Sequence, residues 1–331
     1  MRNETSRRGF IRQGVALTAL SAMGSAVQAG PFGRNKDILP LIDTHQHLWD
    51  LTRYQPPWIN GAPEILNRSY ITKDYNAATR GLNLVKAVYM EVDVDPADQI
   101  REAEHVIALS RSSRYPTVAA VISGRPDEDS FDPYIRKFKD SPYIKGVRQV
   151  LHPETTPQGL CLGKTFVKSM HRLGEQGMSF DLCMRPTELT DGAKLADQAP
   201  DTLFIVDHCG NGDPKAFLKN PAEAPTHKAE QWKQDMAELA KRDNVICKIS
   251  GIVVRAPQDH WTPDMLAPLI NHCLDTFGPD RVVFGGDWPV CRIVASYRQW
   301  VHALKAVIAN RPREQQKKLL HDNADRIYGL S

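Results

Sequence analysis

The fold is indicated first by one stretch of sequence, apolar at its start and closed by two histidines: Leu41-Ile42-Asp43-Thr44-His45-Gln46-His47. Seven similar runs follow at intervals of roughly 25 to 45 residues, each nearly continuous in apolar or β-branched residues, which is typical of parallel strands buried on both faces. These runs are residues 84–92, 117–122, 144–151, 178–183, 203–207, 245–249 and 281–284. We therefore predict eight parallel strands.

Helical patterns lie between the predicted strands, at residues 97–110, 164–175, 229–241, 263–277 and 297–308. In the third of these, Trp232, Met236 and Leu239 recur at helical spacing, which is typical of core packing. Eight alternating strand–helix units predict a closed (β/α)8 TIM barrel. The alternative is an open doubly wound sheet, but that fold usually has a glycine-rich turn after its first strand, and no GxGxxG motif follows this one.

Two insertions interrupt the regular spacing, and each follows a predicted strand. Residues 49–73 are rich in proline and aromatic residues, and residues 209–226 contain three prolines. Because the loops after the strands form the active-site face of a barrel, we expect both insertions to roof the site. The last segment, residues 312–331, is expected to form terminal helices packed on the barrel.

The first residues have the pattern of an export signal. Arg7 and Arg8 form an arginine pair, an apolar stretch of small residues follows, and Val27-Gln28-Ala29 offers a cleavage site. We expect residues 1–29 to be a twin-arginine signal peptide, residues 30–331 to be the barrel domain, and the mature protein to be periplasmic. The apolar stretch is too short for a stable membrane span.

The composition is that of a globular protein, with 41% hydrophobic and 24% charged residues among 331. The net charge of +3 is too small to indicate a nucleic-acid partner, so we expect a small-molecule substrate and leave a homo-oligomer open. The six cysteines contain no CxxC pair, which disfavours a zinc knuckle or a thioredoxin-like site. We expect buried free thiols, with disulfides formed after export as the alternative.

Four residues at the ends of predicted strands carry the expected chemistry. His45 and His47 alternate along the first strand and therefore point to the same side, where both can reach one metal ion. His208 ends the sixth run, and Asp287 follows the eighth run after two glycines. A carboxylate at the mouth of a barrel can bind metal or accept a proton from water. The alternatives are surface or core histidines and a helix N-cap aspartate.

In these residues the chain resembles the amidohydrolase superfamily, in the amidohydrolase-related (amidohydrolase 2) branch. That branch includes sugar lactonases of the L-fuconolactonase and L-rhamnonolactonase type and 2-pyrone-4,6-dicarboxylate lactonase. The resemblance rests on IDTHQHLWD at 42–50, VDHCG at 206–210 and GGDWP at 285–289, and it extends over the chain after the signal. It implies that His45 and His47 bind metal or substrate, that His208 binds metal or acts at the carbonyl, and that Asp287 is the general base.

Two departures from the family pattern bear on the metal. Many members have a carboxylated lysine or a glutamate at the end of the fourth strand, where this sequence reads KGVRQVLH at 145–152 with Arg148 as the inward group. Many also have a histidine after the fifth strand, where this sequence reads FDLCMR at 180–185. A binuclear centre is therefore not expected. The resemblance implies either no metal or one divalent ion, zinc in preference, with the ligands His45, His47, His208 and Asp287.

Further residues are expected to bind the substrate. Arg148 can pair with a carboxylate or a sugar oxygen through its planar fork and becomes catalytic if no metal binds, with a structural salt bridge as the alternative. Glu91 ends the second strand and is expected to reach the site. Four aromatic residues are expected to line a pocket for a ring-shaped substrate, namely Trp49, Tyr54, Trp58 and Trp288, although loop aromatics also pack on barrels. The weaker candidates are Asp181, Arg185 and Arg255.

The expected reaction is water attack on a lactone or related ester. Asp287 takes the proton from water, and a metal ion, or His45, His47 and Arg148 without one, polarises the carbonyl. Small sugar lactones are the favoured substrates, and acidic cyclic esters are a second class. Asp207 is expected to point away from the site as a structural residue. The alternative functions are a nonoxidative decarboxylase of aromatic acids, an amidase, and an exported binding protein without catalysis.

Overall fold

The computed structural model describes residues 38–331, so the predicted signal peptide lies outside the described residues. Eight strands form one sheet in chain order, and all neighbouring pairs along that order are parallel. All eight predicted strands are confirmed. They are β1 (Leu41–Gln46), β2 (Leu84–Met90), β3 (Thr117–Ser123), β4 (Ile144–Val150), β5 (Ser179–Cys183), β6 (Phe204–Val206), β7 (Val245–Ile249) and β8 (Val282–Phe284).

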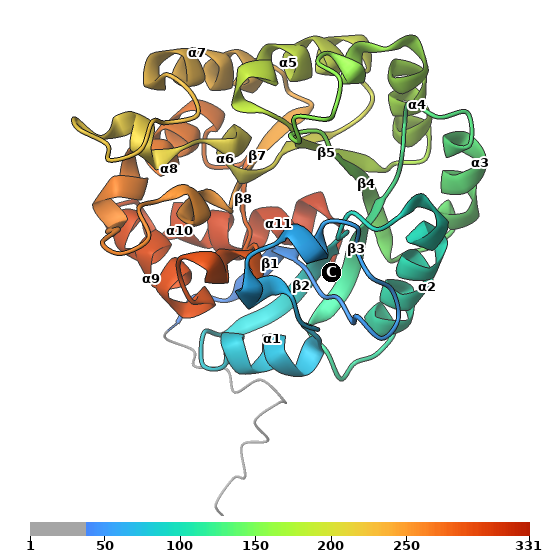
Figure 1. The fold of residues 1–331 in the computed structure, drawn as a ribbon, viewed down its shortest axis with the longest axis horizontal. Helices are drawn as coiled ribbons and strands as arrows, with labels where there is room; N and C mark the ends of the chain where they lie inside the picture. Colours follow the sequence, from blue (N-terminus) through green and yellow to red (C-terminus); the bar gives the residue numbers. More distant parts are fainter. Residues whose placement is uncertain (1–37) are drawn as a thin grey trace, which may run out of the picture.

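The barrel closes where the chain beyond β8 meets the end of β1. Gln46 and Trp288 form a parallel bridge there. The Asp287 amide donates to the His45 carbonyl at 2.9 Å, and the His47 amide donates to the Trp288 carbonyl at 2.8 Å. We call residues 45–47 and 287–288 the seam. Its closure confirms the predicted (β/α)8 TIM barrel, in which a ring of helices surrounds the strands (Figure 1).

Five of the surrounding helices lie where the sequence predicts them. They are α2 (Gln99–Ser110), α4 (Lys164–Glu175), α7 (Ala229–Ala240), α8 (Pro263–Phe277) and α9 (Tyr297–Val307). The start of α9 is set locally, because Ser296 and Gln299 form a capping box in which each side chain accepts from the other residue's amide.

Three further helices are absent from the sequence prediction: α1 (Thr72–Thr79), α3 (Phe131–Ile135) and α5 (Leu189–Gln198). The first begins inside the predicted insertion, the second has only five residues, and the third contains Gly192, which weakens its helix propensity. Their apolar patterns are too short or too interrupted to stand out, and packing on the barrel stabilises them.

The apolar core has two layers, one inside the barrel and one between the strands and the helices. The inner layer includes Ile42, Val88, Val121, Ile205 and Val283, together with two residues of the chain end, Ala324 and Tyr328. The predicted terminal helices are confirmed as α10 (Arg313–Lys317), the π-helical η10 (Lys318–Asp322) and α11 (Asn323–Ile327). Figure 1 shows α11 and the carboxyl terminus across the middle of the ring. The chain end therefore packs against the interior of the barrel.

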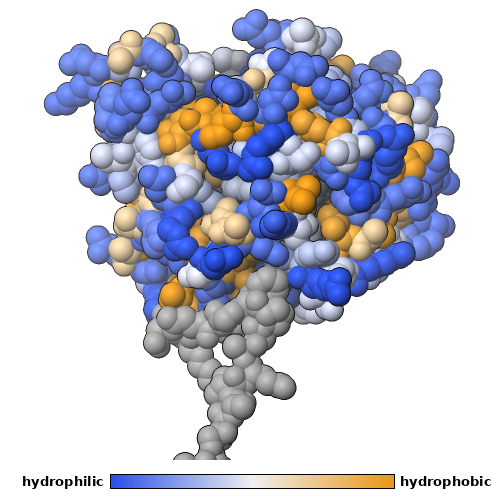
Figure 2. Space-filling model, turned by 60° about the horizontal axis from the view of Figure 1, so that its bottom comes forward, coloured by the Kyte–Doolittle hydropathy of each residue, from blue (hydrophilic) through white to orange (hydrophobic). Residues whose placement is uncertain are grey.

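Both predicted insertions contribute to the cavity described below. The first contains η1 (Ile59–Gly61) and η2 (Glu64–Leu66) and folds back on itself through a bridge between Trp49 and Tyr70. The second contains α6 (His208–Asn211) and η7 (Pro214–Phe217). Within residues 38–331, no helix has the length and apolar character needed to cross a bilayer. The face shown in Figure 2 is mostly hydrophilic, with apolar side chains in separate patches.

Candidate active site

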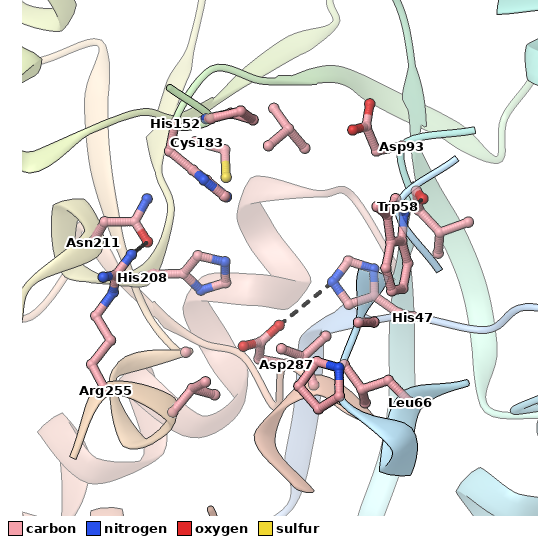
Figure 3. A pocket seen from close by; sticks show the side chains of 18 of the residues that line it. His47, Trp58, Leu66, Asp93, His152, Cys183, His208, Asn211, Arg255 and Asp287 are labelled. Carbon is pink, nitrogen blue, oxygen red and sulfur yellow. Dashed lines mark hydrogen bonds and ion pairs between the residues drawn. The ribbon is translucent and has the colours of Figure 1, made fainter. Parts of the chain in front are cut away.

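The four residues with predicted chemistry come together at the carboxyl ends of β1, β6 and β8. The ring centroid of His45 lies 4.8 Å from that of His47 and 4.5 Å from that of His208. Asp287 Oδ1 lies 3.5 Å from His47 Nε2 and 3.8 Å from His45 Nε2. In Figure 3 the side chains of Asp287 and His47 point toward each other, and His208 reaches into the cavity from the opposite side.

The backbone at two of these residues is strained. His208 and Asp287 have φ values of 54° and 51°, in the left-handed region that non-glycine residues seldom adopt. Such conformations cost about 1–3 kcal/mol each and cluster at functional sites. The space beside His208 exists because Gly251 has no side chain, since a Cβ there would lie 2.2 Å from His208 Nδ1. The fold therefore gives up stability to hold these two side chains in the cavity.

Asp43 joins the two strand ends beneath the site. Its Oδ1 accepts from the backbone amides of His45 at 2.9 Å and Gly286 at 2.7 Å. Its Oδ2 accepts from the hydroxyls of Tyr75 at 2.7 Å and Tyr297 at 3.0 Å. Burial raises the pKa of Asp43, whereas these four hydrogen bonds favour its ionised form. Because the two amides belong to the segments that carry the site, Asp43 fixes the spacing between them.

Hydrogen bonds on the far side of each ring determine which histidine nitrogen carries a lone pair. His47 Nδ1 lies 3.0 Å from the Met90 carbonyl oxygen, which only accepts, so Nδ1 carries the hydrogen. His45 Nδ1 faces Asp207 Oδ1 at 3.5 Å, and its Nε2 accepts from Arg148 Nη1 at 3.2 Å. Burial lowers the pKa of His45 well below its usual range, which keeps the ring neutral. The Nε2 lone pair of His47 therefore faces the site, whereas the Nε2 lone pair of His45 is engaged by Arg148.

Asp207 corrects one expectation from the sequence, because it faces the site residues instead of pointing away from them. Lys248 Nζ lies 2.9 Å from Asp207 Oδ1 and 2.5 Å from Asp181 Oδ2, and all three side chains are fully buried. Burial alone would raise the pKa of Asp207, but Lys248 and His45 bring it well below its usual range. Burial raises the pKa of Asp181 to about 7 despite Lys248. Asp207 is therefore the ionised carboxylate that orients His45.

Arg148 is held by a buried ion pair. Its Nε donates to Glu91 Oε1 at 2.6 Å, and its Nη2 donates to the Glu91 carbonyl oxygen at 2.9 Å. The salt bridge named above as the alternative is therefore present, although Arg148 also lines the cavity. Glu91 was expected to bind substrate, but it is fully buried and does not belong to the cavity wall. Its two carboxylate oxygens accept from Arg148 Nε and from the Asp93 amide, so both are occupied beneath the cavity.

A cavity of about 690 Å³ opens above these residues. Trp49 lines it, as the sequence predicts, and Trp58 stands beside Trp49 with their rings edge to face at 5.3 Å. Trp288 was also expected on this wall but is not part of it. The Trp288 ring packs beneath the roof against Tyr70 and Tyr75, at centroid distances of 5.2 and 5.3 Å. A space of this size with aromatic walls suits a small ring-shaped molecule.

The opposite wall of the cavity is basic. Arg255 donates to Asn211 Oδ1 at 3.4 Å and forms no ion pair with any residue in the described part of the chain, and Figure 3 shows both side chains next to His208. Burial and the positive groups around it, His208 and Arg255 first, lower the pKa of His152 to about 4. Lys215 also lines this wall. No sequence motif marks His152 or Lys215, since His152 lies in the irregular segment after β4 and Lys215 in the short helix η7 of the second insertion.

Two groups of donor atoms in the site can hold a metal ion, each with its atoms within 4.8 Å of one another: His45, His47 and Asp287, and His45, Asp207 and His208. His208 therefore joins Asp207 instead of the first group, where it was expected. In the first group, two nitrogen lone pairs and a carboxylate oxygen face one another, an arrangement that a cation stabilises. Zinc accepts such N, N, O ligands, and the groups behind the two rings orient them as in zinc sites.

An eight-stranded barrel with a His-His-Asp cluster at the carboxyl ends of its strands has the architecture of a barrel hydrolase of the amidohydrolase type. The chain belongs to the amidohydrolase family, whose sequence profile matches residues 42–330. The resemblance found in the sequence motifs is thereby confirmed, and the protein is a hydrolase.

Several known proteins are similar along most of their length. The L-fucono-1,5-lactonase of Burkholderia multivorans is 24% identical over 301 residues, which cover 87% of this chain and 96% of that protein. The L-rhamnono-gamma-lactonase of Scheffersomyces stipitis is 22% identical over 344 residues, which cover 88% and 98%. A solved amidohydrolase structure from Burkholderia multivorans with bound zinc has a TM-score of 0.75 at 22% identity, covering 88% of this chain and 100% of that one. This structural likeness supports the fold.

Proposed function

We propose that this protein hydrolyses a small lactone, with Asp287 as the general base. One observation carries the proposal: Asp287 Oδ1 lies at the cavity wall, 3.5 Å from the lone-pair nitrogen of His47. A carboxylate in this position can take a proton from water on the substrate side. Similarity to proteins named as lactonases favours an ester carbonyl over an amide.

The chain's own residues account for each step. Water next to Asp287 loses a proton to the carboxylate as its oxygen attacks the lactone carbonyl carbon. The negative charge that develops on the carbonyl oxygen is stabilised by the Arg148 guanidinium and by His208, whose Nδ1 lies 2.9 Å from Ser250 Oγ and whose Nε2 remains for the substrate. The ring C–O bond then breaks, and Asp287 returns the proton to the leaving alkoxide.

The residues proposed to hold a divalent metal ion, zinc in preference, are His45, His47 and Asp287. When bound, such an ion acts as a Lewis acid that lowers the pKa of water and polarises the carbonyl. Asp207 and the Met90 carbonyl hold the two rings in place from behind. Arg148 supplies positive charge at the same place whether or not an ion is bound.

The substrate proposed is a sugar lactone whose polar substituents face the basic wall. The apolar side of the ring would pack on Trp49 and Trp58, and hydroxyl or carboxylate oxygens would accept from Arg255. Arg255 supports this placement because it makes only one hydrogen bond within the described part of the chain, to Asn211 Oδ1 at 3.4 Å. Its other N–H groups are therefore available to substrate oxygens.

The test is acid release from a panel of neutral and carboxylate-bearing lactones. Wild-type protein should open at least one of them, and Arg255→Gln should raise KM by about tenfold with a smaller change in kcat, as expected for lost binding. Carbon dioxide release from an aromatic acid without lactone opening would replace the proposal with a decarboxylase. A ligand-dependent melting shift without any turnover would replace it with a binding protein.

We also propose export by the twin-arginine route, supported by Arg7 and Arg8 in the sequence. Changing both residues to lysine should leave the precursor in the cytoplasm, as measured by cell fractionation. Equal periplasmic amounts of the variant and the wild type would contradict this route.

A further inference from the structure

Three of the six cysteines meet at one point outside the candidate active site. Cys209 follows β6, Cys247 lies in β7 and Cys273 lies in α8, and their three sulfur atoms all lie within 4.8 Å of one another. Each residue is fully buried, at 0% exposure. The three thiols therefore come from three different elements of the fold, and the folding of the chain brings them together.

The backbone at Cys209 is part of this arrangement. Cys209 has a φ of 51°, in a run of four consecutive left-handed residues from His208 to Asn211. This conformation places the Cys209 sulfur with the other two cysteines, while the neighbouring His208 ring lies in the cavity. The Cys209 carbonyl accepts from Trp232 Nε1 at 3.0 Å, which fixes the turn from outside. A strained non-glycine residue at such a point indicates a functional constraint.

The chemistry of three converging thiols favours a soft metal ion. Among the metals found in proteins, thiolate ligands preferentially bind Cu(I), zinc and iron–sulfur clusters. Structural zinc sites use four ligands, whereas within residues 38–331 no histidine or carboxylate joins these three sulfurs. Three sulfur donors without a fourth ligand match a three-coordinate Cu(I) ion.

We propose that Cys209, Cys247 and Cys273 form a second metal site that binds one Cu(I) ion. Binding replaces thiol protons by the metal, with no change in the oxidation state of either partner. The site is separate from the His-Asp cluster and does not depend on the proposed lactone hydrolysis. Because Cys209 adjoins His208, a bound ion would also brace the turn that presents His208 to the cavity.

The experiment is copper analysis of the full chain, produced with copper supplied in the medium and purified under reducing, oxygen-free conditions. The wild type should contain close to one copper ion per chain with copper–sulfur bonds in its X-ray absorption spectrum. Cys273→Ser should lose both. The matched control is Cys161→Ser, which removes another buried cysteine outside the cluster and should retain the copper.

Thermal stability gives a second readout, because a ligand that binds only the folded protein raises the melting temperature of that protein. Copper should raise the melting temperature of the wild type and of Cys161→Ser but not that of Cys273→Ser. If Cys273→Ser does not fold, Cys247→Ala takes its place in both measurements. Equal copper in the cluster variant, zinc in place of copper, or a cluster disulfide that lowers the protein mass by two hydrogens would each overturn the proposal.

Discussion

Arg148 Nη1 donates to His45 Nε2 across 3.2 Å. The positively charged guanidinium therefore contacts one of the three residues that would bind a metal ion. Positive charge at the site is therefore present before any metal arrives. The guanidinium and a metal ion would share one lone pair, which should weaken metal binding relative to a site built from the same ligands alone.

Removing His47 should remove the metal. In His47→Ala, zinc bound per chain after dialysis should fall to background, because one of two nitrogen donors is lost. Elemental mass spectrometry of the purified protein makes the measurement. The matched control is His272→Ala, since His272 contacts the Lys233 carbonyl outside the cavity and should leave the zinc content unchanged. Equal zinc content in the two variants would contradict the assignment.

Arg148 and Glu91 should be energetically coupled. Removing one partner of a buried ion pair leaves an unpaired charge and costs about 3–5 kcal/mol, so Arg148→Met should lower the free energy of unfolding by that order. The double variant Arg148→Met/Glu91→Gln should be more stable than Arg148→Met by at least about 1 kcal/mol. Urea unfolding of the wild type, Arg148→Met, Glu91→Gln and the double variant measures the coupling. If the two single losses in the free energy of unfolding add up to the loss in the double variant, the pair does not interact.

Changing Asp287 should stop the reaction without unfolding the barrel. Asp287→Asn keeps the size of the side chain but cannot accept the proton, so kcat should fall by about 100-fold or more. Circular dichroism and the melting temperature should stay close to the wild type. Turnover that survives the substitution would place the base elsewhere.

Asp181 should make stability depend on pH. Its pKa is raised to about 7 in the folded protein, so the folded state binds this proton more tightly than the unfolded chain does. Its contribution to the free energy of unfolding should therefore fall as pH rises from about 4 to about 7 and stay level above that range.

Asp181→Asn should remove the part of the pH dependence of the free energy of unfolding that Asp181 contributes, and the parts contributed by other groups should remain. The measurement is urea unfolding at several pH values for the wild type, Asp181→Asn and Asp197→Asn, in which an exposed aspartate paired with Arg242 is changed instead. The same slope in all three proteins would show that Asp181 is not protonated in this range.

Asp43 should be needed to position the site. Asp43→Asn can keep the acceptor for the His45 and Gly286 amides but offers an NH₂ group to the hydroxyls of Tyr75 and Tyr297, which donate to Asp43. We expect a loss of about 1–3 kcal/mol in the free energy of unfolding and a lower kcat. Thermal unfolding with activity measurement tests both, and an unchanged kcat would show that the strand ends do not need this carboxylate.

The strands were predictable because both faces of each are buried, which leaves continuous apolar runs in the sequence. Helices such as α5 were not, because a glycine and polar residues interrupt the pattern and the contacts that stabilise them come from distant strands. The four residues of the site were predictable in kind, since a histidine or an aspartate directly after a strand of a barrel faces its mouth.

The ion-pair network beneath the site could not be derived from local sequence. Lys248 interrupts the otherwise apolar strand VICKI at its fourth residue, which is a signal for a charge inside the barrel. Its partners Asp181 and Asp207 come from β5 and from the end of β6, so only the register of neighbouring strands brings them together. The inward turn of Asp207 depends on Lys248, and the burial of Glu91 depends on Arg148, and both partners are distant in the sequence.

The seam has a consequence for when the enzyme becomes active. Its backbone hydrogen bonds join His45 and His47, at the end of the first strand, to Asp287 and Trp288 after the last strand. A ribosome completes the histidines early and Asp287 near the end of synthesis, so a partly made chain lacks the carboxylate that we propose activates water. Recovery of turnover during refolding should therefore follow the final closure of the barrel, and chains that end before Asp287 should be inactive.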